Sequence, residues 1–306
     1  MEFLYFLEGI RVPVLNEFML LITRLGEETA FLVMALIVFW CVDKRRGYLL
    51  MTVGFLGTMA NQFMKLWFRI PRPWVLDPEF TILEQAREAA SGYSFPSGHT
   101  TSAVGTFGSI AASSRKKGTI ALCVCLAMLV GLSRMYIGVH TPADVLVGAL
   151  TSIILIAALR KAVLSDHGMP VIIGIMVAMA LGLLAFVSFY PFPADVDAHN
   201  LQSGVKNAWT MIGCMAGVLV VYHFEKKYVN FTTMAVWWAQ ILKIVLGLGL
   251  VLAVKEGLRA PLEALFGNPY PARAVRYFLI VLVAGVLWPM SFRMFYRMGR
   301  RMEVRK

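Results

Sequence analysis

The sequence predicts an all-α, polytopic transmembrane helical bundle, and three observations support that fold class. Of its 306 residues, 58% are hydrophobic and only 15% are charged, whereas soluble globular domains average about 25% charged residues. The mean hydropathy is +0.69. The apolar runs are also roughly twenty residues long, which is the length of an α-helix that crosses a bilayer. These features exclude an ordinary soluble protein and make the membrane bilayer an expected partner.

Nine apolar stretches are expected to cross the membrane. Their approximate bounds are 26–42, 47–69, 99–114, 118–138, 141–160, 170–190, 207–224, 235–255 and 275–296. Residues 1–25 mix charged and apolar positions around Pro13, so we expect an interfacial or re-entrant amphipathic segment there rather than a span. Pro71 and Pro73 follow the second stretch and should end its helix near residue 70.

The net charge of +11 raises the question of nucleic-acid binding, but the positions of the basic residues argue against it. They cluster in alternate linkers: Lys44-Arg45-Arg46, Arg115-Lys116-Lys117, Arg160-Lys161, Lys226-Lys227 and the tail from Arg297 to Lys306. Such clusters mark the cytoplasmic side of a membrane protein. The remaining loops, over 70–98, 139–140, 191–206 and 256–274, then fall on the outer face, and no nucleic-acid partner is expected.

One short stretch, from Ser133 to Asp144, joins two of the predicted spans. Thr141 is a suitable N-cap, Pro142 suits the first helical position, and Asp144 falls at the third. Asp144 also follows His140 by four residues, so its carboxylate can turn back toward the imidazole. The alternative is a capping box in which Asp144 only bonds the N–H groups of the first turn.

Two further segments on the outer face carry polar residues at the ends of predicted spans. Lys65 lies about one turn inside the end of its helix, where a lysine is either functional or extends toward the interface. Ser97, Gly98 and His99 open the third predicted span. A helix start of this kind offers backbone N–H groups and the positive end of the helix dipole to an anion. The alternative is an ordinary serine cap beside an interfacial histidine, which has the same sequence pattern.

Taken together, the three segments suggest a site for a multiply charged oxyanion. They supply three cations, two histidines and a carboxylate on one membrane face: Lys65, Arg72, Arg134, His99, His140 and Asp144. Phosphate suits such a site because arginine matches its geometry bidentately. Histidine can serve as a nucleophile or as a proton donor, and a carboxylate can hold it in the required tautomer.

These residues resemble the type-2 phosphatidic acid phosphatase (PAP2) superfamily, whose motifs read K-x6-R-P, P-S-G-H and S-R-x5-H-x3-D. The sequence matches all three, with Lys65 to Arg72-Pro73, Pro96 to His99, and Ser133-Arg134 to His140 and Asp144. The resemblance covers about residues 12–163. It implies a PAP2-like catalytic transmembrane core over residues 1–165, with 1–25 as the interfacial segment, and about four additional C-terminal spans of unknown role over residues 166–306.

The resemblance also implies roles for individual residues. His140 would attack phosphorus and form a phosphohistidine, Asp144 would orient its imidazole, and His99 would act as acid and then as base. The expected substrate-binding residues are Lys65, Arg72, Ser97, Gly98 and Arg134. The family works without a metal, so no metal or other cofactor is expected.

The expected function is that of a multi-pass plasma-membrane phosphatase with its active site on the extracytoplasmic face. Its substrate would be a lipid phosphate monoester or pyrophosphate: phosphatidic acid, phosphatidylglycerol phosphate or an isoprenyl pyrophosphate. The alternatives are a phosphatase for small soluble phosphate esters, a vanadate-dependent haloperoxidase, against which the spans argue, and a non-enzymatic lipid transporter or scaffold. The sequence neither ranks the lipids nor indicates an oligomeric state.

Lys243 stands apart from these motifs, in the middle of a predicted C-terminal span. An unpaired ammonium is costly at that depth. We therefore predict that Lys243 faces the interior of the bundle, with an oxygen acceptor or a polar cavity within reach.

Overall fold

The computed structural model describes residues 1–87, 90, 92–165 and 168–303. Its residues form two compact units, which are described separately. Unit one comprises residues 1–34, 49–164 and 190–204, and unit two comprises residues 35–48, 165–189 and 205–306. The end of the basic tail, residues 304–306, lies outside the described part of the chain. The expected division of the chain near residue 165 stays a prediction.

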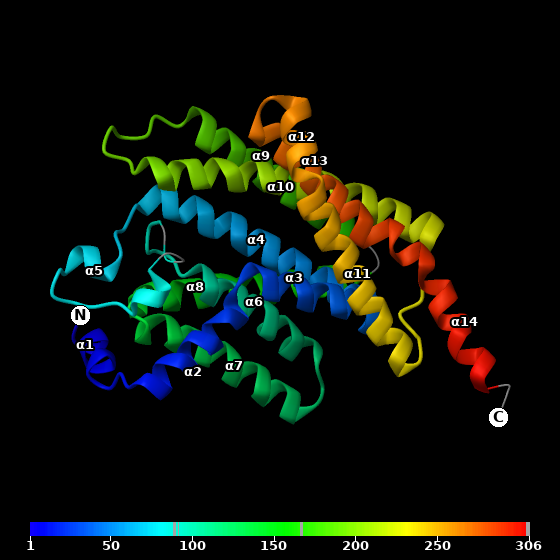
Figure 1. Cartoon of the computed structure of the whole chain (residues 1–306), viewed down its shortest axis with the longest axis horizontal. Helices are drawn as coiled ribbons and strands as arrows, with labels where there is room; N and C mark the ends of the chain where they lie inside the picture. Colours follow the sequence, from blue (N-terminus) through cyan, green and yellow to red (C-terminus); the bar gives the residue numbers. More distant parts are fainter. Residues whose placement is uncertain (88–89, 91, 166–167, 304–306) are drawn as a thin grey trace. The chain divides into compact units, whose positions relative to one another are not determined.

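Every regular element among the described residues is a helix (Figure 1). The first eight α-helices are α1 (Glu2–Gly9), α2 (Pro13–Thr23), α3 (Glu28–Ile37), α4 (Lys44–Phe68), α5 (Pro73–Leu76), α6 (Gly98–Ser113), α7 (Lys117–Tyr136) and α8 (Pro142–Leu164). The rest are α9 (Met169–Phe189), α10 (Ala198–Phe224), α11 (Trp237–Gly257), α12 (Arg259–Phe266), α13 (Pro269–Leu282) and α14 (Phe292–Glu303). The all-α prediction is confirmed.

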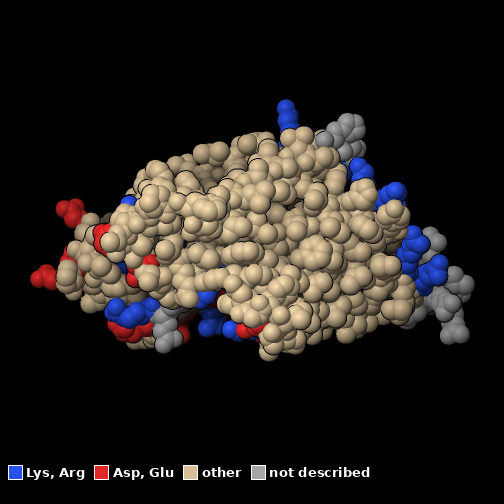
Figure 2. Space-filling model, turned by 90° about the horizontal axis from the view of Figure 1, so that it is seen from above, with Lys and Arg blue, Asp and Glu red and all other residues tan. Residues whose placement is uncertain are grey.

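Six helical segments in the described residues are long and apolar enough to cross a membrane. They are Lys117–Tyr136, Pro142–Leu164, Met169–Phe189, Ala198–Val229, Trp237–Phe266 and Pro269–Met298, and the bent pair Pro13–Gly26 and Glu28–Val42 would make a seventh. Most of the surface seen in Figure 2 carries no charged side chain, as expected for a polytopic membrane protein. Two predicted spans fall short of these criteria, because Asn61 and Gln62 make α4 more polar and α6 has only 16 residues.

The core of unit one is built around α6, which packs against both α7 and α8, while α2 packs against α7 (Figure 1). Gly148 allows α8 to approach the start of α6 closely. A Cβ atom at this position would lie 2.7 Å from the carbonyl oxygen of Ser97, which is closer than a side chain tolerates. This contact places the beginnings of α6 and α8 side by side.

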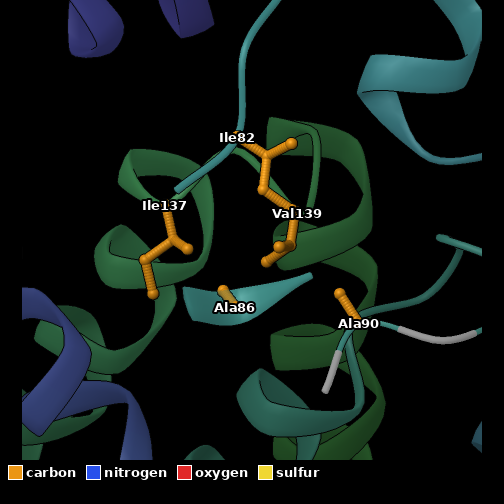
Figure 3. Packing of buried hydrophobic residues seen from close by; sticks show 5 residues of the cluster. All are labelled: Ile82, Ala86, Ala90, Ile137 and Val139. Carbon is orange, nitrogen blue, oxygen red and sulfur yellow. The ribbon is translucent and has the colours of Figure 1, made fainter. Parts of the chain in front are cut away.

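The connection between α7 and α8 is held by the long loop that follows α5. Ile137 and Val139 pack against Ile82, Ala86 and Ala90 of that loop, as Figure 3 shows. The backbone N–H of Leu83 also donates to the carbonyl of Ile137 at 3.0 Å. Gly138, between Ile137 and Val139, has a φ of +91°, a conformation that favours glycine. His140 follows Val139, so the backbone that carries its side chain is held in place by these contacts.

Residues 1–25 form two helices with a break around Ile10–Val12. Leu7 of α1 and Met19 of α2 are buried against Tyr136 at the end of α7. Arg11, in the break, donates to the carbonyl of Tyr136 at 3.0 Å. The N-terminal segment therefore covers the end of α7, and its interfacial location stays a prediction.

Unit two contains the buried Lys243 of α11. Its ammonium donates to the carbonyl oxygens of Trp40 at 3.0 Å and Thr233 at 3.2 Å and lies 4.3 Å from the centre of the Phe292 ring. Trp40 belongs to the π-helical turn Val38–Val42, and Thr233 to the non-helical segment before α11, where helical hydrogen bonding does not occupy every carbonyl. The prediction that Lys243 faces the interior and an oxygen acceptor is confirmed.

Three loops predicted for the outer face are partly helical, and the one expected over 70–98 contains α5. The loop expected over 191–206 becomes helical at Ala198, because the Asp197 carboxylate accepts a hydrogen bond from the Asn200 backbone at 2.7 Å and caps α10. The loop expected over 256–274 contains the short helix α12.

Candidate active site

All eight predicted site residues lie in unit one, at the ends of its helices. Lys65 is in the last turn of α4, Arg72 precedes α5, Ser97 caps α6, and Gly98 and His99 begin it. Arg134 is in the last turn of α7, His140 lies in the connection, and Asp144 is in the first turn of α8. The fold thus brings three segments, distant in sequence, to the same end of the unit-one helices.

His140 lies between a guanidinium and a carboxylate. Its side chain is almost fully buried. The Nε2 atom is 3.0 Å from Nη1 of Arg72, and the Nδ1 atom is 3.4 Å from Oδ2 of Asp144. The arginine can only donate, so Nε2 faces it as an acceptor and the proton of the neutral ring belongs on Nδ1, toward Asp144.

The Asp144 carboxylate satisfies both interpretations of the sequence. Its Oδ2 accepts from the Thr141 backbone at 2.7 Å, and the Asp144 N–H donates to the Thr141 hydroxyl at 3.2 Å. This reciprocal pair caps α8. The same Oδ2 faces His140 and accepts a hydrogen bond from the hydroxyl of Ser94. The same oxygen atom therefore both caps the first turn of α8 and faces the imidazole of His140.

Sequence reasoning missed Ser94. This fully buried serine donates to Asp144, and its hydroxyl lies 3.4 Å from Nδ1 of His140. Its own backbone N–H donates to the Ile70 carbonyl at 2.8 Å. A serine in a loop carries no distinctive pattern. The one available signal was that Ser94 lies two residues before the Pro96-Ser97-Gly98-His99 motif.

Arg72 is held rigidly beside His140. Its Nε donates to the Gly92 carbonyl at 2.9 Å and its Nη1 to the Val139 carbonyl at 2.8 Å. Burial lowers the pKa of Arg72 to about 10, against which Asp144 acts in the opposite direction. The guanidinium therefore remains charged at neutral pH, in a position fixed by the backbone.

Two more cations approach the same place. The Lys65 ammonium donates to the carbonyl of Tyr93 and, at 3.4 Å, to that of Ser94. The buried Arg134 donates from Nη1 to the Thr23 hydroxyl at 2.6 Å. Its buried Nε has no hydrogen-bond partner among the described residues. A buried donor of a charged group without a partner is costly, and an anion would relieve that cost.

The three cations act together on His140. Burial is the main cause that holds the pKa of His140 well below its ordinary value, and the charges of Arg72, Arg134 and Lys65 add to it. The imidazole is therefore neutral at neutral pH, with a lone pair on one nitrogen.

The start of α6 forms the other side of the site. The Ser97 hydroxyl accepts from the Thr100 backbone at 3.4 Å and from the Thr100 hydroxyl at 2.9 Å. Ser97 therefore caps α6, which is the alternative that the sequence left open, and its own O–H remains able to donate. His99 is half-buried and lines a cavity of about 240 Å³ together with Lys65 and Gly98.

Gly26 is a second residue that the sequence did not reveal. A Cβ atom at this position would lie 2.8 Å from the carbonyl oxygen of His99 and 3.0 Å from its Cβ. The turn before α3 therefore packs directly on the backbone of His99. Larger residues at position 26 would displace that histidine.

The arrangement is suited to an oxyanion that is attacked by a neutral imidazole. It combines three cations, a helix N-terminus, one histidine oriented by a carboxylate and a second histidine that faces a cavity. Within the described residues, no group of three or more His, Cys, Asp and Glu side chains is placed to hold a metal ion.

Comparisons with known proteins match the chain to family models and to curated relatives. Two family models match the chain: the PAP2 superfamily over residues 46–168 and the PAP2 superfamily phosphatase transmembrane extension over residues 209–300. Phosphatidylglycerophosphatase B of Bacillus subtilis (strain 168) is 34% identical over 152 residues, which cover 45% of this chain and 70% of that protein. Undecaprenyl-diphosphatase BcrC of the same organism is 31% identical over 144 residues, which cover 46% and 72%. No solved structure matches the chain significantly.

Proposed function

Because the chain belongs to the PAP2 superfamily and is therefore a hydrolase of phosphoric monoesters or pyrophosphates, we propose that it dephosphorylates a membrane lipid through a phosphohistidine intermediate on His140. The two Bacillus relatives are named for phosphatidylglycerophosphate and undecaprenyl diphosphate. Both of those compounds are lipid phosphates, and this chain is itself a multi-pass membrane protein. A lipid phosphate is therefore the substrate we propose for it.

The observation that carries this proposal is the geometry of His140. Its Nδ1 faces Asp144 at 3.4 Å and its Nε2 faces Arg72 at 3.0 Å. When a phosphate oxygen binds to Arg72, the Nε2 lone pair faces phosphorus. Asp144 holds the tautomer and stabilises the positive charge that develops on the ring. The Nδ1–Oδ2 distance exceeds that of an ordinary hydrogen bond, and such contacts commonly shorten once substrate binds.

The reaction then proceeds in two balanced steps. In the first, an N–P bond forms on His140 as the P–O bond to the leaving group breaks. His99, protonated once the bound phosphate anion offsets the charge of the neighbouring cations, gives its proton to the leaving oxygen. In the second, a water oxygen attacks phosphorus, the N–P bond breaks, and His99 takes the proton of that water. His99 returns to its starting form, as general acid–base catalysis requires.

The remaining site residues hold the phosphoryl oxygens. Lys65, Arg72 and Arg134 supply positive charge, and the Ser97 hydroxyl and Gly98 N–H supply neutral donors at the start of α6. Positioning and electrostatic stabilisation account for most of the catalysis of phosphoryl transfer. The close packing of the three cations raises the free energy of the empty site and lowers that of the site when it holds a phosphate.

The test is phosphate release by the purified full-length protein in detergent micelles. The panel is phosphatidic acid, phosphatidylglycerol phosphate, an isoprenyl diphosphate and glycerol phosphate. We expect release from at least one lipid, inhibition by vanadate, and no activity in the His140→Ala variant. Release from glycerol phosphate alone would instead support a soluble phosphate ester as the substrate. No release from any of the four would overturn the proposal.

We further propose that the site faces the extracytoplasmic side of the plasma membrane. The loop that carries the exposed Glu79 packs against the end of α7 through Ile82 and Ile137, whereas the exposed Lys116 lies at the start of α7 in a basic linker. Cysteines at positions 79 and 116, in a background without the native cysteines, should be labelled by an impermeant thiol reagent from outside and inside respectively. Labelling of both from one side would contradict this orientation.

A further inference from the structure

The cavity beside His99 lies between three segments of unit one. Its volume is about 240 Å³, and its walls come from α4, α6 and the turn that leads into α3. Lys65, Gly98 and His99 line it, and His140 is not among its lining residues. The cavity therefore opens from the side of the site that carries the proposed proton donor and not the proposed nucleophile.

This position identifies what the cavity holds, if the proposed function is correct. In phosphoryl transfer, the attacking and leaving atoms lie roughly in line on opposite sides of phosphorus. His140 attacks from one side, so the leaving group departs on the other. Because His99 must reach the leaving oxygen to protonate it, the cavity that His99 lines is the one that receives the leaving group.

The wall of the cavity is equipped for hydrogen bonding. The hydroxyl of Ser102 is buried and has no hydrogen-bond partner among the described residues. Ser102 lies one turn after His99 on α6, and the amide of Gln62 on α4 lines the same cavity. A buried hydroxyl without a partner is unfavourable, and a hydroxyl group on a bound ligand would satisfy it.

Two carboxylates line the cavity beside Lys65. The exposed residues Glu27 and Glu28 both line it. A pyrophosphate leaves as a phosphate monoester, which is an anion and is repelled by these carboxylates. A phosphate monoester leaves as a neutral alcohol, which is not repelled. The two carboxylates therefore favour a neutral leaving group over an anionic one.

We propose that this cavity is a leaving-group subsite for a neutral alcohol that carries a second hydroxyl close to the reacting oxygen. Ser102 and Gln62 bind that hydroxyl, and Glu27 disfavours an anionic leaving group. The substrate class is a lipid phosphate monoester of the glycerol type. The proposal rests on the proposed function and names the substrate class of the same site.

Three substrates separate the two elements of this proposal. A 1-acylglycerol 3-phosphate has a neutral leaving group with a neighbouring hydroxyl, and an alkyl phosphate of matched length lacks the hydroxyl. An isoprenyl diphosphate has a charged leaving group. We expect kcat/KM for the full-length protein in micelles to fall in that order.

Ser102→Ala tests the hydroxyl. It should lower kcat/KM for the acylglycerol phosphate by about tenfold and leave the alkyl phosphate unchanged. Thr106→Ala is the matched control, because Thr106 on α6 also carries a buried hydroxyl that has no partner in the described part of the chain but does not line the cavity. An equal loss on both substrates, or the same change of ratio in the control, would overturn the role of Ser102.

Glu27→Gln tests the charge. It should raise kcat/KM for the isoprenyl diphosphate by about threefold, the size expected for an exposed charge pair, with the alkyl phosphate unchanged. An unaltered ratio would overturn the role of Glu27. Failure of the proposed function is recognised separately, because no substrate would then release phosphate in a reaction that depends on His140.

Discussion

Each unit of the protein holds a lysine whose ammonium donates to two backbone carbonyls, but the charges around the two ammonium groups differ. In unit two, Lys243 is surrounded by two carbonyl oxygens and an aromatic ring. In unit one, Lys65, Arg72 and Arg134 lie near enough to interact electrostatically with one another, and Arg134 keeps one buried donor without a partner among the described residues.

The contrast shows that depth in the membrane does not by itself identify a functional residue. The sequence places both Lys65 and Lys243 inside predicted spans, where a lysine is a functional candidate. The structure separates them by what surrounds each ammonium. Lys243 joins irregular backbone segments and is satisfied by the protein alone. Lys65 also donates to two carbonyl oxygens, those of Tyr93 and Ser94, but it lies near the further cations Arg72 and Arg134, whose charge a bound phosphate would offset.

The largest effect is expected at the residue on which the cations of unit one act. His140→Ala removes the proposed nucleophile, so phosphate release should fall by at least about 10⁴-fold with no phosphoenzyme. His99→Ala should retain the first step for a substrate with a good leaving group and then accumulate phosphohistidine, since no base activates water. Rapid acid quench with labelled substrate distinguishes the two. An acid-labile phosphoenzyme in His140→Ala would show that the two roles are reversed.

The cations themselves come next. Arg134→Ala should lower kcat by about 10²- to 10³-fold, the usual result of removing a donor to a developing oxyanion. The Thr23→Val variant removes the partner of Arg134 in the structure and serves as the control, with a much smaller expected loss. If both variants lose activity equally, Arg134 acts through its contact with Thr23 and not on the substrate.

Ser94 should have a smaller effect, because it positions Asp144 and does not itself touch the substrate. Ser94→Ala should lower kcat by about tenfold and leave KM unchanged. Ser109→Ala provides the matched control, since Ser109 is equally buried on α6. Equal changes in kcat and KM would indicate that Ser94 contributes to substrate binding instead.

The charge of Arg72 should be visible in the pH dependence. Arg72 lowers the pKa of His140, so its removal raises that pKa and protonation inactivates the nucleophile at a higher pH. Arg72→Gln should therefore shift the acidic limb of kcat/KM to higher pH, whereas Arg72→Lys should leave it in place. The substrate's own titration is common to all variants. An unshifted limb in Arg72→Gln would contradict the electrostatic account.

The smallest effect on activity is expected in unit two. Lys243→Met should leave kcat/KM within about twofold but lower the thermal unfolding temperature in detergent, because two buried carbonyls lose their donor at about 1–3 kcal/mol each. One outcome would contradict this distinction between the two lysines. If it folds with unchanged stability and loses phosphatase activity, Lys243 belongs to the catalytic machinery.

The helices and the motif residues could largely be predicted, because local chemistry determines them. Pro71 and Pro73 end α4 within a few residues of the expected point, and α8 begins at Pro142 as its cap predicted. Ser94 and Gly26 could not be predicted. Ser94 contacts Asp144, and Gly26 contacts the backbone of His99. Both contacts join segments that are distant in sequence, and no local sequence pattern indicates them.

The short helix α12 was missed for a related reason. It lies in a predicted loop, and its amphipathic sequence, Arg259–Phe266, has no side-chain cap at its start. The cap of α10 by Asp197 was also missed, because it lies within the loop expected over 191–206. The first error concerns the existence of a short helix and the second the exact start of a longer one, and neither involves a predicted site residue.

The shared carboxylate of Asp144 has a consequence for how the site responds to local disorder. Each residue of an α-helix rotates the chain by about 100° and advances it by about 1.5 Å, so the register of α8 determines where this oxygen points. Because the atom that caps the helix is also the one that faces His140, fraying of the first turn would remove the contact proposed to orient the imidazole. Catalysis would then cease while nearly all of the bundle was still folded, and activity would report on the integrity of a single helical turn.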